Sequence, residues 1–337
     1  MPTQSCFGMV NLVAMNGLVG RSLLALMLCL TMAGMLWGVV LVAGPGEAAS
    51  SEPRSAAHLD APLPPVAQLR LDPTAAQALI PAPAGQPAPV RKPNPLEQWA
   101  AKTETLLGIP APALIGYGTA DLIMQDRAPK CGLSWITLAA LGRAGAERVH
   151  PRDGVPTAVA AAEAMCAGGR DTTTEAGWES AVRSVGGDTA QVHRVLAAAT
   201  AYATAIQTNV PISAPARVAI DFAIDQIGLP YVWGGNGPSL GDAGFDCSGL
   251  TKAAYATAGV ELPRTAHTQY FAVRHLAAKE PLQPGDLVFY GNPSTKIHHV
   301  GLYIGNGQMI NAPTFGMPVQ VTSYRFSDYV GAGRPAG

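Results

Sequence analysis

The sequence predicts an α+β protein in which a helical region is followed by two more helices and a series of short antiparallel strands. Three observations support this prediction. Apolar residues recur at helical spacing over 96–210, short alternating runs separated by Gly, Asn and Pro follow a helical pattern within 212–335, and a charge-free apolar segment covers 22–44. Helices that precede consecutive strands are typical of the α+β class. With 337 residues and a 48% apolar share, the chain is large enough for two modest cores.

The charge of the chain excludes one large class of partners. Its 22 basic and 23 acidic residues give a formal net charge of -1. The sequence contains no basic run of the kind that follows a phosphate backbone, so we expect no nucleic-acid partner. No pair of Cys or His residues has the spacing of a metal finger, and we expect neither a metal nor a cofactor.

The apolar segment predicts a membrane anchor behind a short N-terminal segment, 1–21. At about 1.5 Å per residue, 22–44 is long enough to cross the roughly 30 Å of a bilayer core. Arg21 precedes this segment and Glu47 and Glu52 follow it, which favours a C-terminus outside the cell. The protein would then be a single-pass cell-membrane protein with extracellular C-terminal domains.

A cleaved signal peptide is the alternative interpretation of the same segment. The residues at 46–48 have the small-x-small pattern of a cleavage site, and the protein would then be secreted. In either case we expect everything after residue 44 to be exported. From 45 to 95 the chain is dominated by Pro and Ala without a sustained period, which predicts a semi-rigid linker that cannot bury a core.

Cysteines occur at five positions: 6, 29, 131, 166 and 247. Export permits disulfides among those that follow the apolar segment. Cys131 and Cys166 fall in the helical region, where they either form a disulfide or pack as two small buried side chains. Cys247 is then left over, and an unpaired thiol in an exported protein requires an explanation.

Cys247 lies where an acidic and polar turn gives way to a helical pattern that begins at about Ser248. Asp246 is a suitable N-cap for that helix. Unpaired amide N–H groups and the positive end of the helix dipole stabilise a thiolate at such a position, so we expect a lowered pKa for the Cys247 thiol. A thiolate nucleophile also requires a base and a group that orients the base.

The candidate bases lie in the run HHVGLYIGNGQMINAP, which predicts a strand, a turn and a second strand. Val300, Leu302 and Ile304 alternate as a core face. This alternation puts His299 on the other face of the strand. We therefore expect His299, and not His298, to face the cleft.

The turn between the two strands decides which later residue meets His299. A three-residue loop, 305–307, would place Leu302 opposite Ile310, so that Asn311 shares the face of His299. A two-residue loop would instead set Asn311 opposite Leu302 and bury a polar amide, which is unfavourable. We therefore expect the three-residue loop, with Asn311 in reach of a ring nitrogen of His299.

A Cys, a later His and a still later Asn form the arrangement of papain-type peptidases. Gly301 has no side chain and would leave room for Asn311 beside the ring of His299. The phrases YVWGG, FDCSGL, LPRTA, LQPGDLVFY and HVGLYIGNGQMINAP resemble the NlpC/P60 family of papain-like cell-wall endopeptidases across most of 212–335. The resemblance implies a papain-like domain with helices packed on an antiparallel sheet.

This resemblance also implies a role for each matching residue. Cys247 would be the nucleophile, His299 the base and Asn311 the orienting group, a position where the family more commonly has His and also has Glu, Gln or Asn. The implied substrates are peptidoglycan stem peptides, cut next to D-glutamate and usually between D-glutamate and diaminopimelate. The residues expected to line the substrate pocket are Tyr231, Asp246, Ser248 and Arg264.

The helical region has a separate resemblance. CGLSWITLAALGR, AEAMCAGGRDTTTEAGWESAVRSVGG and VHRVLAAATAYA resemble the exported soluble lytic transglycosylase-like domains of actinobacteria, which implies a small lysozyme-like domain over 96–210. The residues that carry this resemblance are Trp135, Gly142, Arg143, Trp178 and the cysteines at 131 and 166.

The catalytic acid of that second family is absent. It would be a glutamate, protonated to donate to the glycosidic oxygen, at the position where this chain has Gly145. Glu147 is two positions further on, about 200° around a helix, and would point to the opposite face. We expect a domain that has lost glycan cleavage and that either binds glycan strands or only positions its neighbour.

Two alternatives to a cysteine peptidase follow from the same residues. A zinc site built from Cys247, His298 and His299 is disfavoured because adjacent strand residues point to opposite faces. A membrane-anchored wall-binding scaffold with little catalytic activity is the alternative outside enzymes. Because a conjugation or secretion machine must open peptidoglycan locally, cell-envelope machinery is a further expected partner.

Overall fold

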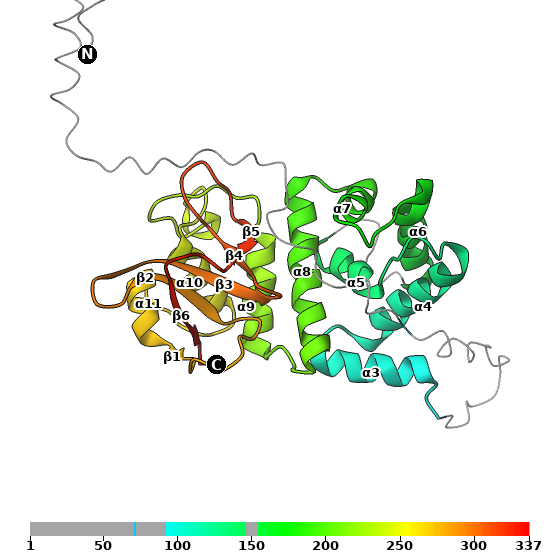
Figure 1. Ribbon diagram of the computed structural model, residues 1–337, viewed down its shortest axis with the longest axis horizontal. Coiled ribbons are helices and arrows are strands. Elements are labelled where there is room, and N and C mark those ends of the chain that lie inside the picture. Colours follow the sequence, from blue (N-terminus) through cyan, green and yellow to red (C-terminus); the bar gives the residue numbers. More distant parts are fainter. Residues whose placement is uncertain (1–70, 72–91, 146–153, 337) are drawn as a thin grey trace, which may run out of the picture. The chain divides into compact units, whose positions relative to one another are not determined.

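The computed structural model describes residue 71 and residues 92–145 and 154–336, all of which lie within one compact unit, Leu59–Gly337 (Figure 1). The predicted anchor at 22–44 and most of the predicted linker lie outside the described residues.

Helices make up the region in which apolar residues recur at helical spacing. Within the described residues they are α3 (Pro95–Leu107), α4 (Ala111–Arg127), α5 (Trp135–Arg143), α6 (Gly154–Cys166), the 3-10 turn η3 (Ala167–Gly169), α7 (Glu175–Ser184) and α8 (Thr189–Thr208). Four of them begin at a polar side chain that accepts a first-turn amide hydrogen, namely Asn94, Ser134, Thr174 and Asp188. No single described helix has the length and apolar character to cross a membrane, and α3 with α4 meets both criteria only as a pair bent by 119°.

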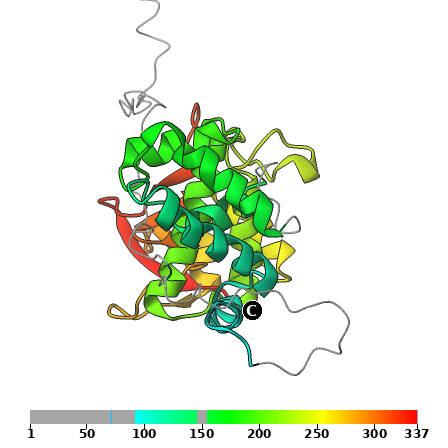
Figure 2. The ribbon, with the colours of Figure 1, turned by 90° about the vertical axis from the view of Figure 1, so that its right-hand side faces the viewer.

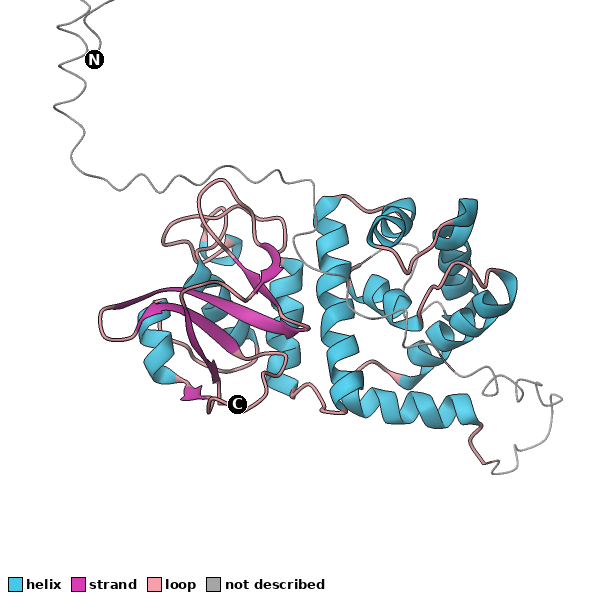
Figure 3. Ribbon diagram, in the orientation of Figure 1, coloured by secondary structure: helices cyan, strands magenta, loops and turns pink. Residues whose placement is uncertain are grey.

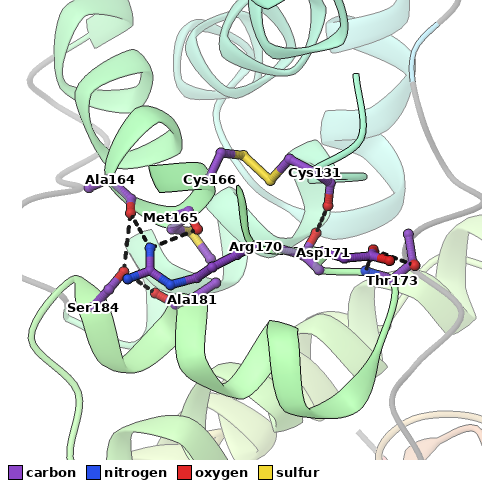
Figure 4. Close-up of a disulfide and its surroundings, with 10 residues drawn as sticks. Cys131, Ala164, Met165, Cys166, Arg170, Asp171, Thr173, Ala181 and Ser184 are labelled. Carbon is purple, nitrogen blue, oxygen red and sulfur yellow. Dashed lines mark hydrogen bonds between the residues drawn. A yellow bond between two sulfur atoms is a disulfide. The ribbon is translucent and has the colours of Figure 1, made fainter. Parts of the chain in front are cut away.

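Cys131 and Cys166 are joined by a disulfide, with their Cα atoms 5.5 Å apart (Figure 4). The bond connects the segment before α5 to the last residue of α6. Around it, the hydroxyl of Thr172 donates to the carbonyl of Cys131 at 2.9 Å, and Arg170 donates to the carbonyl of Ala164 at 2.8 Å. The bond from Arg170 satisfies a carbonyl group near the end of α6 that has no partner within the helix.

Leu71, within the predicted linker, packs against the helical region. Leu71 is buried beside Gly118 of α4, where a Cβ on the glycine would lie 2.7 Å from the Leu71 side chain. The N–H of Leu71 donates to Asp121 at 3.3 Å, and its carbonyl accepts from Gln125 at 3.0 Å. Because Gly118 has no side chain, it leaves room for Leu71, and this residue of the predicted linker packs against the helical region.

The C-terminal region contains the predicted helices and strands (Figure 3). Its elements are α9 (Ala214–Asp225), the 3-10 turn η4 (Pro238–Leu240), α10 (Cys247–Thr257), α11 (Ala266–Ala272), β1 (Arg274–His275), β2 (Leu287–Asn292), β3 (Lys296–Gly305), β4 (Gln308–Asn311), β5 (Gln320–Ser323) and β6 (Tyr329–Arg334). The strands form one antiparallel sheet in the order β1-β6-β2-β3-β4-β5. The α+β prediction is confirmed in this region.

The two faces of the sheet differ in the way that the alternation along β3 predicts. Val300, Leu302 and Ile304 belong to the large core that also contains residues of α9 and α10. Tyr303 belongs instead to a smaller apolar cluster with Tyr290, on the opposite face. His299 precedes Tyr303 by four residues on β3, so both side chains lie on the same face of the strand. The predicted face of His299 is therefore confirmed.

Helix α8 is buried along most of its length, since every residue from 195 to 205 is buried. It contacts α3 and α5 as well as β3 and β5, and lies between these two sets of elements (Figure 1). In the perpendicular view, the cyan and green helices lie in front of the orange and red strands (Figure 2). Its many Ala and Thr residues permit close approach from both directions, as expected for a helix that is apolar all round.

The turn between β3 and β4 differs from the prediction. Gly305 pairs with Gln308, so the loop is the two residues Asn306 and Gly307, whose φ angles of 45° and 75° are both positive. This is the backbone that a type I′ hairpin turn requires. A bulge at Ile304 supplies the extra residue, and the predicted pairing of Leu302 with Ile310 is kept. The three-residue loop is therefore wrong, although the register that it was meant to explain is confirmed.

The space next to Gly301, which we expected to leave room for Asn311, is occupied by another side chain. A Cβ on Gly301 would lie 2.3 Å from the sulfur of Met309, so this methionine and not Asn311 fills the space. The cause is the diagonal packing of a long side chain from β4 across the smallest residue of β3.

The prediction that Glu147 points to the opposite face assumed that the helix continues through position 147, but α5 ends before it. The helix ends at Arg143, and Gly145 has a φ of +73°, in the left-handed region. Glu147 lies outside the described residues, and a rotation of 200° along a continuing helix does not apply. Arg143 itself bonds to Asp221 and, at 3.1 Å, to Asp225, so it connects α5 to α9.

Candidate active site

Cys247 is the first residue of α10, and the backbone before it is held by the cap of that helix. Asp246 is the N-cap, and its carboxylate accepts from the amide of Gly249 at 2.6 Å. The thiol lies 4.0 Å from the carbonyl oxygen of His298 and interacts with the backbone N–H of Val300. These two contacts lie on either side of residue 299, so α10 brings the sulfur against β3 at the level of His299.

The pKa of the Cys247 thiol is raised, and the sequence-based expectation of a lowered value is wrong for the free protein. Burial is the main cause, because the residue is only 8% exposed, and the negative charge of Asp246 acts in the same direction. The N–H groups of Ser248 and Val300 favour the thiolate but do not outweigh these effects. Near neutral pH the resting group is therefore a thiol.

His299 is held by a short chain of hydrogen bonds that runs across three strands. Its Nε2 lies 3.2 Å from Oδ1 of Asn311, and Nδ2 of Asn311 donates to the hydroxyl of Thr322 at 2.8 Å. Because Oδ1 can only accept, the hydrogen of the neutral imidazole is on Nε2. The lone pair is then on Nδ1, which is the nitrogen that can take a proton.

Burial lowers the pKa of His299 to about 4. The hydrogen bond that His299 donates to Asn311 acts in the opposite direction, and the ring of Tyr290 lies against the imidazole with 5.6 Å between ring centroids. The imidazole is therefore neutral at pH 7, which is the state that a general base requires. A neutral thiol beside a neutral base can form the thiolate by one proton transfer.

Three of the predicted pocket residues form one polar cluster. Arg264 donates to both carboxylate oxygens of Asp246, at 2.9 and 2.8 Å, and to the hydroxyl of Ser248 at 3.1 Å. The same two charged side chains hold the loop before α10, since Asp246 accepts from Gly234 at 3.1 Å and Arg264 donates to Gly235 at 3.2 Å. This bidentate pair shapes the wall beside the nucleophile.

The fourth predicted pocket residue, Tyr231, lies close to Cys247 and Asp246. Burial and the nearby groups of Cys247 and Asp246 raise the pKa of its hydroxyl. Its ring meets the ring of Phe315 edge to face, with centroids 5.1 Å apart. Phe315 is 68% exposed and Trp233 is 73% exposed, so the loops around Tyr231 present aromatic surface to solvent.

Residues 228–330 match the model of the NlpC/P60 family. They form an NlpC/P60 domain. This segment contains every residue of the site described above, from Tyr231 to Thr322.

Similar proteins have been named in several bacteria. The chain is 42% identical over 142 residues to peptidoglycan endopeptidase RipB of Mycobacterium tuberculosis, covering 38% of this chain and 57% of that protein. It is 42% identical over 112 residues to the bifunctional muramidase/DL-endopeptidase CwlT of Bacillus subtilis, covering 31% and 33%. It is 49% identical over 92 residues to the probable endopeptidase p60 of Listeria monocytogenes, covering 27% and 18%. The chain thus spans between about a fifth and three fifths of these relatives.

A solved structure of the peptidoglycan hydrolase RipB from Mycobacterium tuberculosis is 37% identical, with a TM-score of 0.32, and covers 36% of this chain and 64% of that one. The similarity to these proteins is restricted to part of the chain, and the matches do not identify the helical region.

Three residues beside the NlpC/P60 site were not found by sequence reasoning. Thr322 on β5, Tyr290 on β2 and Phe315 in the loop after β4 each reach a site residue from a different segment. The register of β2 against β3, which pairs Tyr290 with His299, would have indicated one of them. The other two depend on how β5 and the preceding loop return to the site, and no periodicity in the sequence reports that.

His298 has the role of a polar residue near the start of β3. Its side chain is exposed and bonds to Asp328 at 2.8 Å, away from the thiol of Cys247. Among the residues that the structure describes, no group of three or more His, Cys, Asp or Glu side chains is arranged to hold a metal ion.

Proposed function

We propose that the NlpC/P60 domain is a cysteine endopeptidase that hydrolyses peptidoglycan stem peptides next to D-glutamate. The observation that carries the proposal is the bond between Nε2 of His299 and Asn311, which leaves the lone pair on Nδ1, together with the position of Cys247 against β3. The names of RipB and CwlT support peptidoglycan as the substrate and a DL-endopeptidase type of cleavage.

The reaction would begin with transfer of the thiol proton of Cys247 to Nδ1 of His299. The sulfur then attacks the carbonyl carbon of the scissile amide, and the oxyanion accepts a hydrogen bond from the backbone N–H of Cys247, in the first turn of α10 where N–H groups have no partner within the helix. His299 returns the proton to the leaving amine, and the C–N bond breaks. Water, deprotonated by His299, hydrolyses the thioester and regenerates the thiol.

The test is digestion of purified peptidoglycan with the full chain, followed by mass identification of the released fragments. We expect fragments that end in D-glutamate, and no such fragments with Cys247→Ala. Fragments of another kind that disappear with Cys247→Ala would retain a cysteine peptidase and change the bond cut. Fragments that persist with Cys247→Ala, or none from a folded protein, would contradict the proposal and favour the alternative of a wall-binding scaffold.

We also propose that the domain works outside the cell, held at the membrane by 22–44 or secreted after cleavage of that segment. The disulfide between Cys131 and Cys166 supports an oxidising compartment, because such bonds are rare in reducing ones. Membrane fractionation and N-terminal sequencing of the mature protein distinguish the two forms. A soluble, uncleaved and intracellular chain would contradict both.

For the helical region we propose a supporting role without glycan cleavage, as the resemblance to transglycosylase-like domains and the glycine at position 145 imply. Whether it binds glycan strands is tested by co-sedimentation of the Cys247→Ala chain with peptidoglycan from which all stem peptides have been removed. Cell-envelope machinery remains a proposed partner on the grounds of the linker and anchor alone.

A further inference from the structure

Strand β5 places two polar side chains on the face of the sheet that carries His299. In its register with β4, Gln320 lies opposite Asn311 and Thr322 lies opposite Met309. Residues that are directly opposite each other in antiparallel strands share a face, with Cβ atoms about 4.5–5.5 Å apart. Val321, between the two, faces the large core instead. Both polar residues of β5 are therefore neighbours of the Asn311 amide.

The amide of Asn311 has two ends of opposite hydrogen-bonding character. Its oxygen accepts and its nitrogen donates, so the end that faces His299 decides which ring nitrogen carries the hydrogen. With the oxygen toward the ring, Nε2 is protonated and Nδ1 can accept the thiol proton. With the nitrogen toward the ring, Nε2 must accept, the hydrogen is on Nδ1, and the imidazole cannot act as the base for Cys247.

A carboxylate in this place would have no such alternative, since both of its oxygens accept. An asparagine instead depends on a second partner. We propose that Thr322 is a positioning residue that acts through Asn311: its hydroxyl accepts from Nδ2 at 2.8 Å and so keeps the amide oxygen on Nε2 of His299. The kinetic part of this inference rests on the proposed peptidase function, whereas the structural part does not.

Thr322 is needed as an acceptor when the ring is charged. After His299 has taken the thiol proton, both ring nitrogens are donors, and only the oxygen of Asn311 can serve Nε2. The amide nitrogen must then point away from the ring, toward the hydroxyl of Thr322. Removing that hydroxyl leaves the amide donor of Asn311, a residue that is only 1% exposed, without this partner, which is unfavourable.

Gln320 gives the opposite orientation a partner. Its Nε2 is buried and makes no hydrogen bond with any described residue. Because Gln320 lies directly opposite Asn311, this donor would be satisfied if the oxygen of Asn311 turned toward it. Gln320 and Thr322 therefore favour opposite orientations of the Asn311 amide. In this structure the amide nitrogen donates to Thr322.

The decisive experiment measures the tautomer of His299 in the full chain by ¹H–¹⁵N NMR of its ring nitrogens at neutral pH. We expect the Nε2–H form in the unaltered protein and in Thr322→Ser, which keeps the hydroxyl. In Thr322→Val we expect at least half of the population to shift to the Nδ1–H form. Ser323→Ala, on the same strand with its side chain on the other face, is the matched control and should leave the tautomer unchanged.

The kinetic arm follows cleavage of a stem peptide by the same variants. Thr322→Val should lower kcat roughly 10- to 100-fold with KM within a factor of about two, because an outer partner that orients a histidine is lost. Thr322→Ser should recover most of that loss. Adding Gln320→Leu to Thr322→Val removes the competing donor, and should return part of the Nε2–H population and part of kcat.

The outcomes separate this inference from the proposed function. If Thr322→Val keeps the Nε2–H tautomer, or if it lowers cleavage and stability without changing the tautomer, the inference is wrong. If the protein cleaves no peptide but the tautomer shifts as expected, the inference stands and the proposed function is wrong. If Thr322→Val does not fold, Thr322→Ala, which also lacks the hydroxyl and keeps Gln320, provides the same comparison, and an unchanged tautomer in that variant also overturns the inference.

Discussion

The sequence resemblances place a catalytic group at residues 145 and 247, and these two residues lie at opposite kinds of helix end. Gly145 follows the C-terminal end of α5, with a positive φ, and a Cβ there would meet no atom of the described residues within 4 Å. Cys247 begins α10, is buried, and touches the backbone of β3. A helix N-terminus supplies N–H groups and a positive dipole, whereas the left-handed turn after a helix supplies neither. The two positions therefore differ in the backbone groups that surround them.

The helical region nevertheless supports the strands that carry the site. Thr200 of α8 donates to the buried side chain of Gln308 at 3.1 Å. A Cβ on Gly305 would lie 2.0 Å from the hydroxyl of Thr204, so α8 approaches the turn between β3 and β4 as closely as a glycine allows. The hairpin that presents His299 and Asn311 is therefore packed against the helix that the two regions share.

The largest loss of activity is expected when the thiol of Cys247 or the imidazole of His299 is removed. Cys247→Ala and His299→Ala should each lower stem-peptide cleavage on the order of 10⁴-fold or more, since nucleophile and base act as a unit. His298→Ala is the matched control, because that side chain is exposed and pairs with Asp328. Fragment release and thermal unfolding are measured together. Cleavage within about tenfold of the unaltered protein in a folded Cys247→Ala chain would end the assignment.

Removing the orienting group should have a smaller effect. Asn311→Ala leaves the imidazole able to adopt the required tautomer part of the time, so we expect kcat to fall roughly 10- to 100-fold. Asn311→Asp should retain more activity, because a carboxylate also accepts from Nε2. Steady-state kinetics on one stem peptide measures both. A loss with Asn311→Ala as complete as that of Cys247→Ala would mean that the amide does more than orient the ring.

The contact between α8 and the hairpin predicts an effect from outside the site. Gly305→Ala meets both a positive φ of 109° and Thr204, and should lower the free energy of unfolding by about 2–4 kcal/mol and reduce cleavage. Gly307→Ala is the control, with a φ of 75° but no atom nearer than 3.8 Å, and should lower it by about 1–2 kcal/mol. Equal losses in chemical denaturation would mean that the approach of α8 contributes nothing.

The pH dependence of thiol labelling tests the resting state of the site. Burial raises the pKa of Cys247 and lowers that of His299 to about 4, so both groups are neutral at pH 7. Iodoacetamide should label Cys247 slowly at pH 7 and faster as the pH rises beyond the ordinary thiol value of about 8.5. The cysteines at 131 and 166 should stay unlabelled without reductant. Fast labelling of Cys247 at pH 6 would instead indicate a thiolate and imidazolium pair.

The smallest effect on activity is expected from a substitution at Gly145. Gly145→Glu restores the residue type of a catalytic acid, but at a backbone position with a positive φ and with no atom of the described part of the chain within 4 Å of a Cβ. We expect no anhydro-sugar products from glycan strands at any pH, by mass analysis, and peptide cleavage within about twofold of the unaltered chain. Anhydro-sugar release by this variant would show that only the side chain was missing. Release by the unaltered chain would show that the acid is elsewhere in the sequence.

Local residue patterns were sufficient to predict the features that depend on neighbouring residues. The alternation of Val300, Leu302 and Ile304 sets the face of His299, because side chains in a strand alternate. Asp246 before an apolar helical pattern places the N-cap, and so places Cys247 in the first turn. Such features need only the local period of the chain, and each agrees with the structure.

The features that depend on contacts between distant segments could not be predicted from local patterns and are seen only in the folded structure. The bulge at Ile304 replaces a longer loop because a type I′ turn and a fixed register have to be satisfied together. The pKa of Cys247 rises because β3 and its surroundings remove water, against the local effect of the helix end. The contact of Thr322 with Asn311 exists because β5 returns beside β4. Burial and cross-strand pairing depend on residues that are far apart in the chain, so a short stretch of sequence cannot predict them.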